Sequence, residues 1–217
     1  MSELHFEMTV PPGADRDTPV VVLLHGRGAD CRDLLPISPH LPEGTALVAP
    51  QAPFPGSEWG YGGGWAWYRY EGEDRVDPTS LEESVAHLDR FLAGLPERLG
   101  FEPSTVTLGG FSQGGTTSLA YALQNPGAVA GLIVLSGFLA QAPGIRTELD
   151  TVRGMRFFWG HGLQDPMIPH RLAVKGRERL RQAGADLTTR DYRAGHTITL
   201  EELRDLHAWL QGAPGAS

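Results

Sequence analysis

A serine near the middle of the chain has neighbours whose types and spacing suit nucleophilic chemistry. The segment Gly110-Phe111-Ser112-Gln113-Gly114 reads G-x-S-x-G, between a strand-like run at 104–109 and a helix-compatible run at 115–123. A tight strand-to-helix turn holds the serine hydroxyl in the open, and the flanking glycines leave room for that turn. Because a chain with 28 glycines can produce this pattern by chance, the interpretation depends on finding partners for Ser112.

The first partner is a base, since a serine hydroxyl is a weak nucleophile at neutral pH. His196 is the predicted base, because it follows the strand-like run 187–192 after a short loop, and sites in parallel sheets gather at the carboxyl ends of strands. His25 and His161 also end strands, but each precedes a glycine and a turn, and a structural role is favoured for both. Solvated or packing roles are expected for the other five histidines, His5, His40, His87, His170 and His207.

The second partner is an acid that orients the base. Asp165 lies just past the strand-like run 155–159, and Pro166 begins a restrained turn that can aim its carboxylate inward. The rivals are Asp186 and Asp191, which flank or lie within a strand, and Asp150, which lies in an excursion from the regular elements. With Asp165 preferred, the chain order is serine, aspartate, histidine.

Backbone amides are expected to stabilise the oxyanion. One donor is the amide of Gln113, at a helix N-terminus where free N–H groups and the helix dipole favour negative charge. The other comes from the loop after the run 20–24, where glycines on both sides of Arg27 let its amide approach an oxyanion closely.

The elements that position these residues alternate between strands and helices, which predicts a mostly parallel α/β sheet covered on both faces. The run 4–10 alternates as an edge strand, whereas 20–24 is continuously apolar, as in a buried parallel strand. The helix predicted over 79–99 has Thr79 or Ser80 available as its cap. Further strands are expected at 46–49, 104–109, 130–136, 155–160 and 187–192, and further helices at 115–123, 170–183 and 200–210.

Residues 51–77 form a long stretch rich in glycine, proline and aromatic residues, with no clear period. Long loops in compact domains are usually functional or disordered, and the aromatics argue against disorder. We hypothesise that the 55–76 segment is a substrate loop in which Trp65 and Trp67 line an apolar acyl pocket. Ile168, beside Asp165, would add a further wall. The alternative is that the aromatics only cover the core.

Composition narrows the classes of function. The chain has 217 residues, 41% hydrophobic residues and a net charge of -8, with no basic run, which argues against nucleic acid or anionic lipid as a partner. No apolar run is long enough for a membrane span, and no secretory leader is apparent at the start. Cys31 is the only cysteine, which excludes an internal disulfide and a cysteine-based metal cluster. We therefore expect a cytoplasmic protein with one domain over 1–217 and a frayed tail at 212–217.

Four segments, taken together and in order, resemble the carboxylesterase, phospholipase and acyl-protein thioesterase branch of the α/β-hydrolases. They are Leu24-His25-Gly26-Arg27-Gly28-Ala29-Asp30, Gly109-Gly110-Phe111-Ser112-Gln113-Gly114-Gly115, His161-Gly162 through Asp165-Pro166 with Ile168-Pro169, and Tyr192 through Gly195-His196. The resemblance implies an α/β-hydrolase fold of about seven or eight strands with no large cap domain. It places a catalytic triad on Ser112, Asp165 and His196, and oxyanion amides on Arg27 and Gln113.

The resemblance implies a serine hydrolase that cleaves carboxylic esters of small to medium acyl chains through an acyl-enzyme, without metal or organic cofactor. Thioesterase or lysophospholipase activity with the same triad remains open. A dienelactone-hydrolase-like lactonase and a non-catalytic hydrolase-fold protein are less favoured, because the turn carries serine and no triad member is missing. Members of this branch often form dimers, so a homodimer is possible. One departure is Arg27, where the family often has leucine, and it would put a cation at the mouth of the site.

Overall fold

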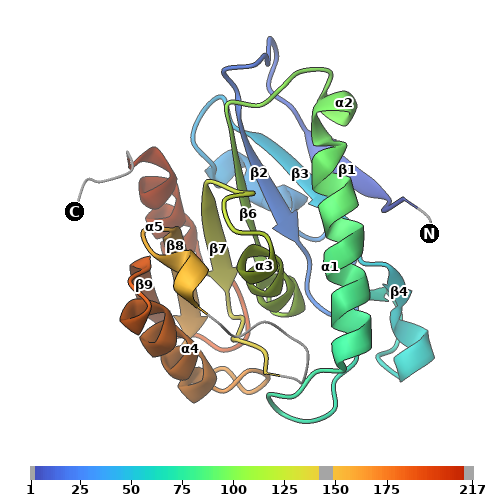
Figure 1. The fold of residues 1–217 in the computed structure, drawn as a ribbon, viewed down its shortest axis with the longest axis vertical. Helices are drawn as coiled ribbons and strands as arrows, with labels where there is room; N and C mark the ends of the chain where they lie inside the picture. The colour runs from blue at the N-terminus through green and yellow to red at the C-terminus, as the bar shows by residue number, and fades with distance from the viewer. Residues whose placement is uncertain (1–2, 142–148, 213–217) are drawn as a thin grey trace.

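The computed structural model describes residues 3–141 and 149–212, and its centre is a seven-stranded sheet (Figure 1). The strand order is β1-β3-β2-β6-β7-β8-β9. The edge strand β1 pairs antiparallel with β3, and all the other pairs in this sheet are parallel. The bounds are β1 Phe6–Thr9, β2 Pro19–Leu24, β3 Ala46–Pro50, β6 Thr105–Phe111, β7 Gly131–Leu135, β8 Arg156–Gly162 and β9 Asp186–Tyr192. The mostly parallel sheet expected from the alternation of elements is confirmed.

Both faces of the sheet are buried, which explains the continuously apolar strands. In β2, Val20, Val22 and Leu24 pack into one hydrophobic cluster while Val21 and Leu23 pack into the other. Successive side chains of a strand point to opposite faces, so an apolar run without alternation is what a doubly covered strand requires.

Helices α1 (Pro78–Ala93), α3 (Gln113–Gln124) and α4 (His170–Gln182) supply residues to the first cluster, and α1 and α3 stand in front of the sheet in Figure 1. Helix α5 (Leu200–Gln211) and the 3-10 helix η1 (Leu35–His40) cover the second cluster. Within the described ranges, no helix is long and apolar enough to cross a membrane.

The helix expected over 79–99 is divided in two, which corrects the prediction. Helix α1 ends at Ala93, and a short α2 (Leu95–Leu99) follows Gly94. Pro96 lacks an N–H and cannot continue the hydrogen-bond ladder of α1. The cap is Asp77 rather than Thr79 or Ser80: its carboxylate accepts from the amide of Ser80 at 2.9 Å, and proline occupies the first helical position.

The stretch 51–77 contains regular structure. Strands β4 (Phe54–Pro55) and β5 (Trp65–Ala66) form a two-stranded sheet, and the 3-10 helix η2 (Gly56–Trp59) lies between them. Another short 3-10 helix, η3 (Asp150–Val152), precedes β8. At the C-terminus α5 runs to Gln211 with Gly212 as its cap, and the rest of the predicted frayed tail lies outside the described residues.

Candidate active site

Ser112 occupies a strained turn between β6 and α3. Its φ of 55° and ψ of −115° are unusual for a residue with a side chain. A Cβ at Gly110 would lie 2.5 Å from the Leu24 carbonyl oxygen, and one at Gly114 would lie 2.0 Å from the same atom. Glycine is therefore required on both sides, because the turn presses its backbone against the end of β2. The helix α3 starts directly after the serine, as the motif predicts.

The loop after β9 brings His196 to this serine. The Nε2 atom of His196 lies 2.9 Å from Ser112 Oγ, and the Phe111 ring packs against the imidazole with centres 4.7 Å apart. A Cβ on Gly162 would lie 2.2 Å from the Gly195 carbonyl oxygen, so a bare backbone after β8 lets the histidine loop approach. The histidine side chain is 17% exposed, which leaves the imidazole accessible from the cavity.

Asp165 completes a continuous chain of hydrogen bonds. Its Oδ2 lies 2.6 Å from His196 Nδ1, and its carboxylate is fully buried. The other oxygen, Oδ1, accepts from the amides of Met167 at 2.8 Å and Ile168 at 2.9 Å. These two bonds fix the orientation of the carboxylate. With the Nδ1 proton directed at Asp165, Nε2 is free to accept the proton of the serine hydroxyl.

The rival carboxylates lie in other environments. Asp191 contacts Arg177 Nη1 at 2.6 Å and His170 Nε2 at 3.0 Å, and this hydrogen bonding to Arg177 and His170 outweighs partial burial and lowers its pKa. Asp186 is exposed at the start of β9, and the side chain of Asp150 lies outside what the structure describes. Neither Asp186 nor Asp191 is hydrogen-bonded to His196 among the described contacts.

His25 and His161 are bound to backbone. His25 accepts from the amide of Ala52 at 3.0 Å, so its Nδ1 carries the proton and donates to the Gly26 carbonyl at 2.7 Å. Burial lowers the pKa of His25 to about 4 and keeps it neutral. His161 Nε2 donates to the Ile168 carbonyl at 2.8 Å, and burial lowers its pKa. His161 Nε2 also lies 3.6 Å from Asp165 Oδ2. Sequence reasoning missed this contact, which helps to hold the loop that carries Asp165.

The two expected oxyanion amides are free. Among the described residues, neither the Arg27 amide nor the Gln113 amide donates a hydrogen bond within the protein. The side chain of Gln113 has a role that the sequence did not reveal. Its Oε1 accepts from the amide of Trp67 at 3.0 Å, and its Nε2 donates to the Tyr68 carbonyl at 2.8 Å. Gln113 therefore ties the aromatic stretch to the start of α3.

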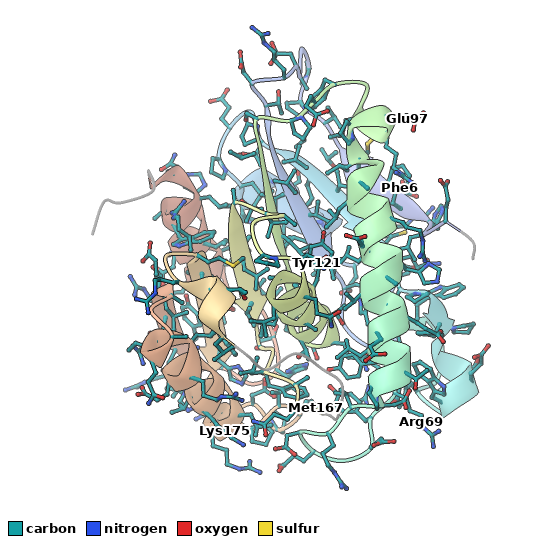
Figure 2. All side chains as sticks on the ribbon, viewed as in Figure 1. Phe6, Arg69, Glu97, Tyr121, Met167 and Lys175 are labelled. Atoms are coloured by element: carbon teal, nitrogen blue, oxygen red, sulfur yellow. The ribbon has the colours of Figure 1, made fainter. Side chains whose placement is uncertain are left out.

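A half-open cavity of about 360 Å³ reaches Ser112 and His196. Met167, labelled in Figure 2, lies on this cavity at the end of the molecule toward which the parallel strands point. The lining residues are Gly26, Arg27, Tyr70, Gly72, Glu73, Phe111, Ser112, Met167, Ile168 and His196. Ile168 is therefore at the cavity, as hypothesised.

Trp65 and Trp67 are not among the residues that line this cavity, which corrects the pocket hypothesis. The indole of Trp67 is fully buried, and its Nε1 donates to the His25 carbonyl at 2.9 Å. Trp65 joins β5 to the loop after β2, through a backbone bond from its amide to the Ala29 carbonyl at 2.8 Å. Tyr70 and Met167 line the cavity in place of the two tryptophans. Their contribution is visible only from the packing of distant segments.

One possible set of metal ligands occurs among the described residues, at the start of the edge strand β1 and in the loop after β2. Ligand atoms of His5, Glu7 and the buried Cys31 lie within 4.8 Å of one another. The Glu7 carboxylate is already bound by Arg32 at 3.1 Å. None of these residues lines the cavity at Ser112.

Comparisons with known proteins identify the family of this chain. Residues 6–213 match the Phospholipase/Carboxylesterase family model. The chain is 30% identical over 147 residues to acyl-protein thioesterase 1 of Kluyveromyces lactis, covering 64% of this chain and 63% of that protein. It is 31% identical over 141 residues to a probable SOBER1-like carboxylesterase of Arabidopsis thaliana, covering 62% and 52%. The matched part thus spans between about half and two thirds of these relatives' length.

A solved structure shares nearly the whole fold. The crystal structure of esterase PE8 superposes with a TM-score of 0.82 at 28% identity, covering 97% of this chain and 99% of that one. The family model and the extent of this superposition lead to one conclusion: the chain is a member of the phospholipase/carboxylesterase family, with the α/β-hydrolase fold.

Proposed function

We propose that this chain is a serine hydrolase that cleaves carboxylic esters of small to medium acyl chains through an acyl-enzyme. The observation that carries the proposal is the hydrogen-bonded chain from Ser112 Oγ through His196 to the buried Asp165. Its geometry meets the requirement for an activated nucleophile, in which the base is itself oriented by a third group.

In the proposed mechanism, Ser112 Oγ attacks the ester carbonyl while His196 Nε2 accepts the hydroxyl proton. Asp165 holds the imidazole in the correct tautomer and stabilises its charged form. The free amides of Arg27 and Gln113 bind the tetrahedral oxygen, and each such donor typically contributes about 10²–10³ in rate. His196 then protonates the leaving alcohol, and water repeats the cycle on the acyl-enzyme.

The experiment that tests this proposal combines labelling with mutagenesis. A fluorophosphonate should label Ser112, and Ser112→Ala should lower kcat toward p-nitrophenyl esters by at least about 10⁴, as for other triads. Ser57→Ala, at an exposed serine of η2, is the control and should keep full activity. Ester hydrolysis that survives Ser112→Ala would exclude this serine as the nucleophile, and no activity toward any ester would favour a non-catalytic protein.

Thioester or lysophospholipid hydrolysis is the second candidate, because relatives of this chain carry the names acyl-protein thioesterase 1 and lysophospholipase-like protein 1. The same hydrogen-bonded chain would serve these substrates, since each presents a carbonyl to the serine. Matched esters, thioesters and lysophospholipids of equal acyl length, compared by kcat/KM, separate the candidates.

The proposal also covers partners and location. The net charge of -8 and the absence of a basic run in the sequence favour small molecules over nucleic acid or an anionic membrane surface as partners. A cytoplasmic location is part of the same proposal. A homodimer remains a prediction, which sedimentation of the purified protein would test.

A further inference from the structure

The side chain of Arg27 is held against aromatic rings at the cavity. Its guanidinium carbon lies 4.8 Å from the centre of the Tyr61 ring and 5.4 Å from that of Tyr70. The rings are themselves anchored, because the Tyr70 amide donates to the Tyr61 hydroxyl at 2.7 Å and the Tyr70 ring stacks on Phe138 at 6.5 Å. A guanidinium whose face rests on an aromatic ring keeps the N–H groups at its edge available.

The guanidinium of Arg27 is not part of an ion pair within the described ranges: no carboxylate there lies within 4.0 Å of it. Among the described residues that line the cavity, Glu73 is the one with an acidic side chain, and Arg171 already binds its carboxylate. A positive charge without an ion-pair partner among the described residues therefore lines the cavity of the nucleophile, although the chain as a whole carries a net charge of -8.

The positive charge of Arg27 lies where a bound substrate would reach it. Arg27 lines the same cavity as Ser112 and His196, and Tyr70 and Ile168 supply apolar wall between polar groups. An ester with its carbonyl at Ser112 would extend along this wall, where an anionic group further along the molecule would meet the guanidinium. Planar guanidinium groups bind carboxylates and phosphates through two parallel hydrogen bonds.

We propose that the Arg27 side chain binds an anionic group, a carboxylate or a phosphate, on the ester substrate, so that the enzyme selects anionic esters over neutral esters of the same size. This inference rests on the proposed esterase function and adds a substrate class to it.

The test compares matched esters. In the carboxylate arm, mono-p-nitrophenyl adipate is compared with p-nitrophenyl hexanoate, which has a methyl group where the adipate has a carboxylate. In the phosphate arm, 1-butyrylglycerol 3-phosphate is compared with 1-butyrylglycerol. The quantity measured is the ratio of kcat/KM for the anionic ester to that for the neutral ester. This ratio cancels any effect of a substitution on the Arg27 amide.

We expect a ratio above one in at least one arm, and a fall of about tenfold in Arg27→Met, because charge-assisted hydrogen bonds are strong but screened in a half-open site. Arg27→Lys should keep much of the preference, and added NaCl should weaken it. Arg69→Met is the control: Arg69, labelled in Figure 2, is an exposed arginine of the same aromatic stretch that does not line the cavity, and its substitution should leave the ratio unchanged.

The outcomes separate the two proposals. Neutral esters hydrolysed through Ser112, with ratios that Arg27→Met does not change in either arm, would overturn the inference and leave the esterase proposal standing. In that case a lower midpoint of thermal unfolding in Arg27→Met would show that the stacked side chain only stabilises the aromatic stretch. If no ester is hydrolysed at all, both proposals fail.

Discussion

Replacement of Asp165 by asparagine tests the proposed mechanism at its most constrained point. In the structure, Oδ1 accepts from two amides, those of Met167 at 2.8 Å and Ile168 at 2.9 Å, while Oδ2 faces His196 Nδ1 at 2.6 Å. In Asp165→Asn the amide oxygen must stay with the two N–H donors, since the alternative would place an NH₂ group against them. The new NH₂ group then faces Nδ1 of His196.

The consequence is a change of tautomer rather than a change of shape. An NH₂ donor opposite Nδ1 makes that nitrogen an acceptor, so the proton moves to Nε2 and points at Ser112. The imidazole can no longer take the serine proton. The corresponding change in serine proteases lowers kcat by about 10⁴, which is about 5.5 kcal/mol in activation free energy at 1.36 kcal/mol for each factor of ten.

The assay is kcat and kcat/KM for p-nitrophenyl esters, with circular dichroism and thermal unfolding to show that the variant is folded. The matched control is Asp186→Asn, at an exposed carboxylate at the start of β9, which should retain wild-type kcat. A folded Asp165→Asn variant that keeps more than about a tenth of wild-type kcat would refute the tautomer argument and the role of Asp165.

Met167→Ala should enlarge the cavity and raise kcat/KM for longer acyl chains relative to short ones, because Met167 lines the cavity and is 52% exposed. Trp65→Ala should leave the dependence of kcat/KM on acyl-chain length unchanged. A changed dependence in Trp65→Ala, with none in Met167→Ala, would support the hypothesis that the tryptophans line the acyl pocket. Burial raises the pKa of the Glu202 carboxyl from 4.5 to about 7, so this carboxyl holds its proton more tightly in the folded chain than in the unfolded chain. The free energy of unfolding therefore falls as pH rises through this window, by roughly 2–3 kcal/mol. Glu202→Gln should remove that fall in urea titrations at pH 5 and pH 8, whereas Glu201→Gln, at an exposed neighbour, should retain it; equal pH dependence in both variants would contradict the assignment.

Most of the regular elements follow from local patterns. The runs that became β2, β7 and β8 are apolar without alternation, because both faces of each strand are covered, and that signal is visible in the chain itself. The boundary at Gly94 was missed although its causes are in the sequence. Asp77 followed by proline marks the true helix start, and Pro96 interrupts the apolar stripe on which the longer helix was predicted.

The aromatic stretch 55–76 shows what local sequence patterns do not predict. Nothing in the order of residues 55–76 distinguishes Trp67, which is buried against the His25 carbonyl, from Tyr70, which lines the cavity. The backbone of Trp67 and Tyr68 is held by the side chain of Gln113, which lies more than forty positions away in the sequence.

Local patterns were enough to predict the sheet, the serine turn, and the order in which Ser112, Asp165 and His196 leave their strands. These depend on periodicity, glycine spacing and the rule that parallel strands end at one edge. Which aromatic side chains face the cavity, and that Arg27 forms no ion pair with a carboxylate of the described residues, became visible only in the folded chain. The physical reason is that side-chain direction and charge pairing depend on contacts between distant segments, which no local pattern in the chain encodes.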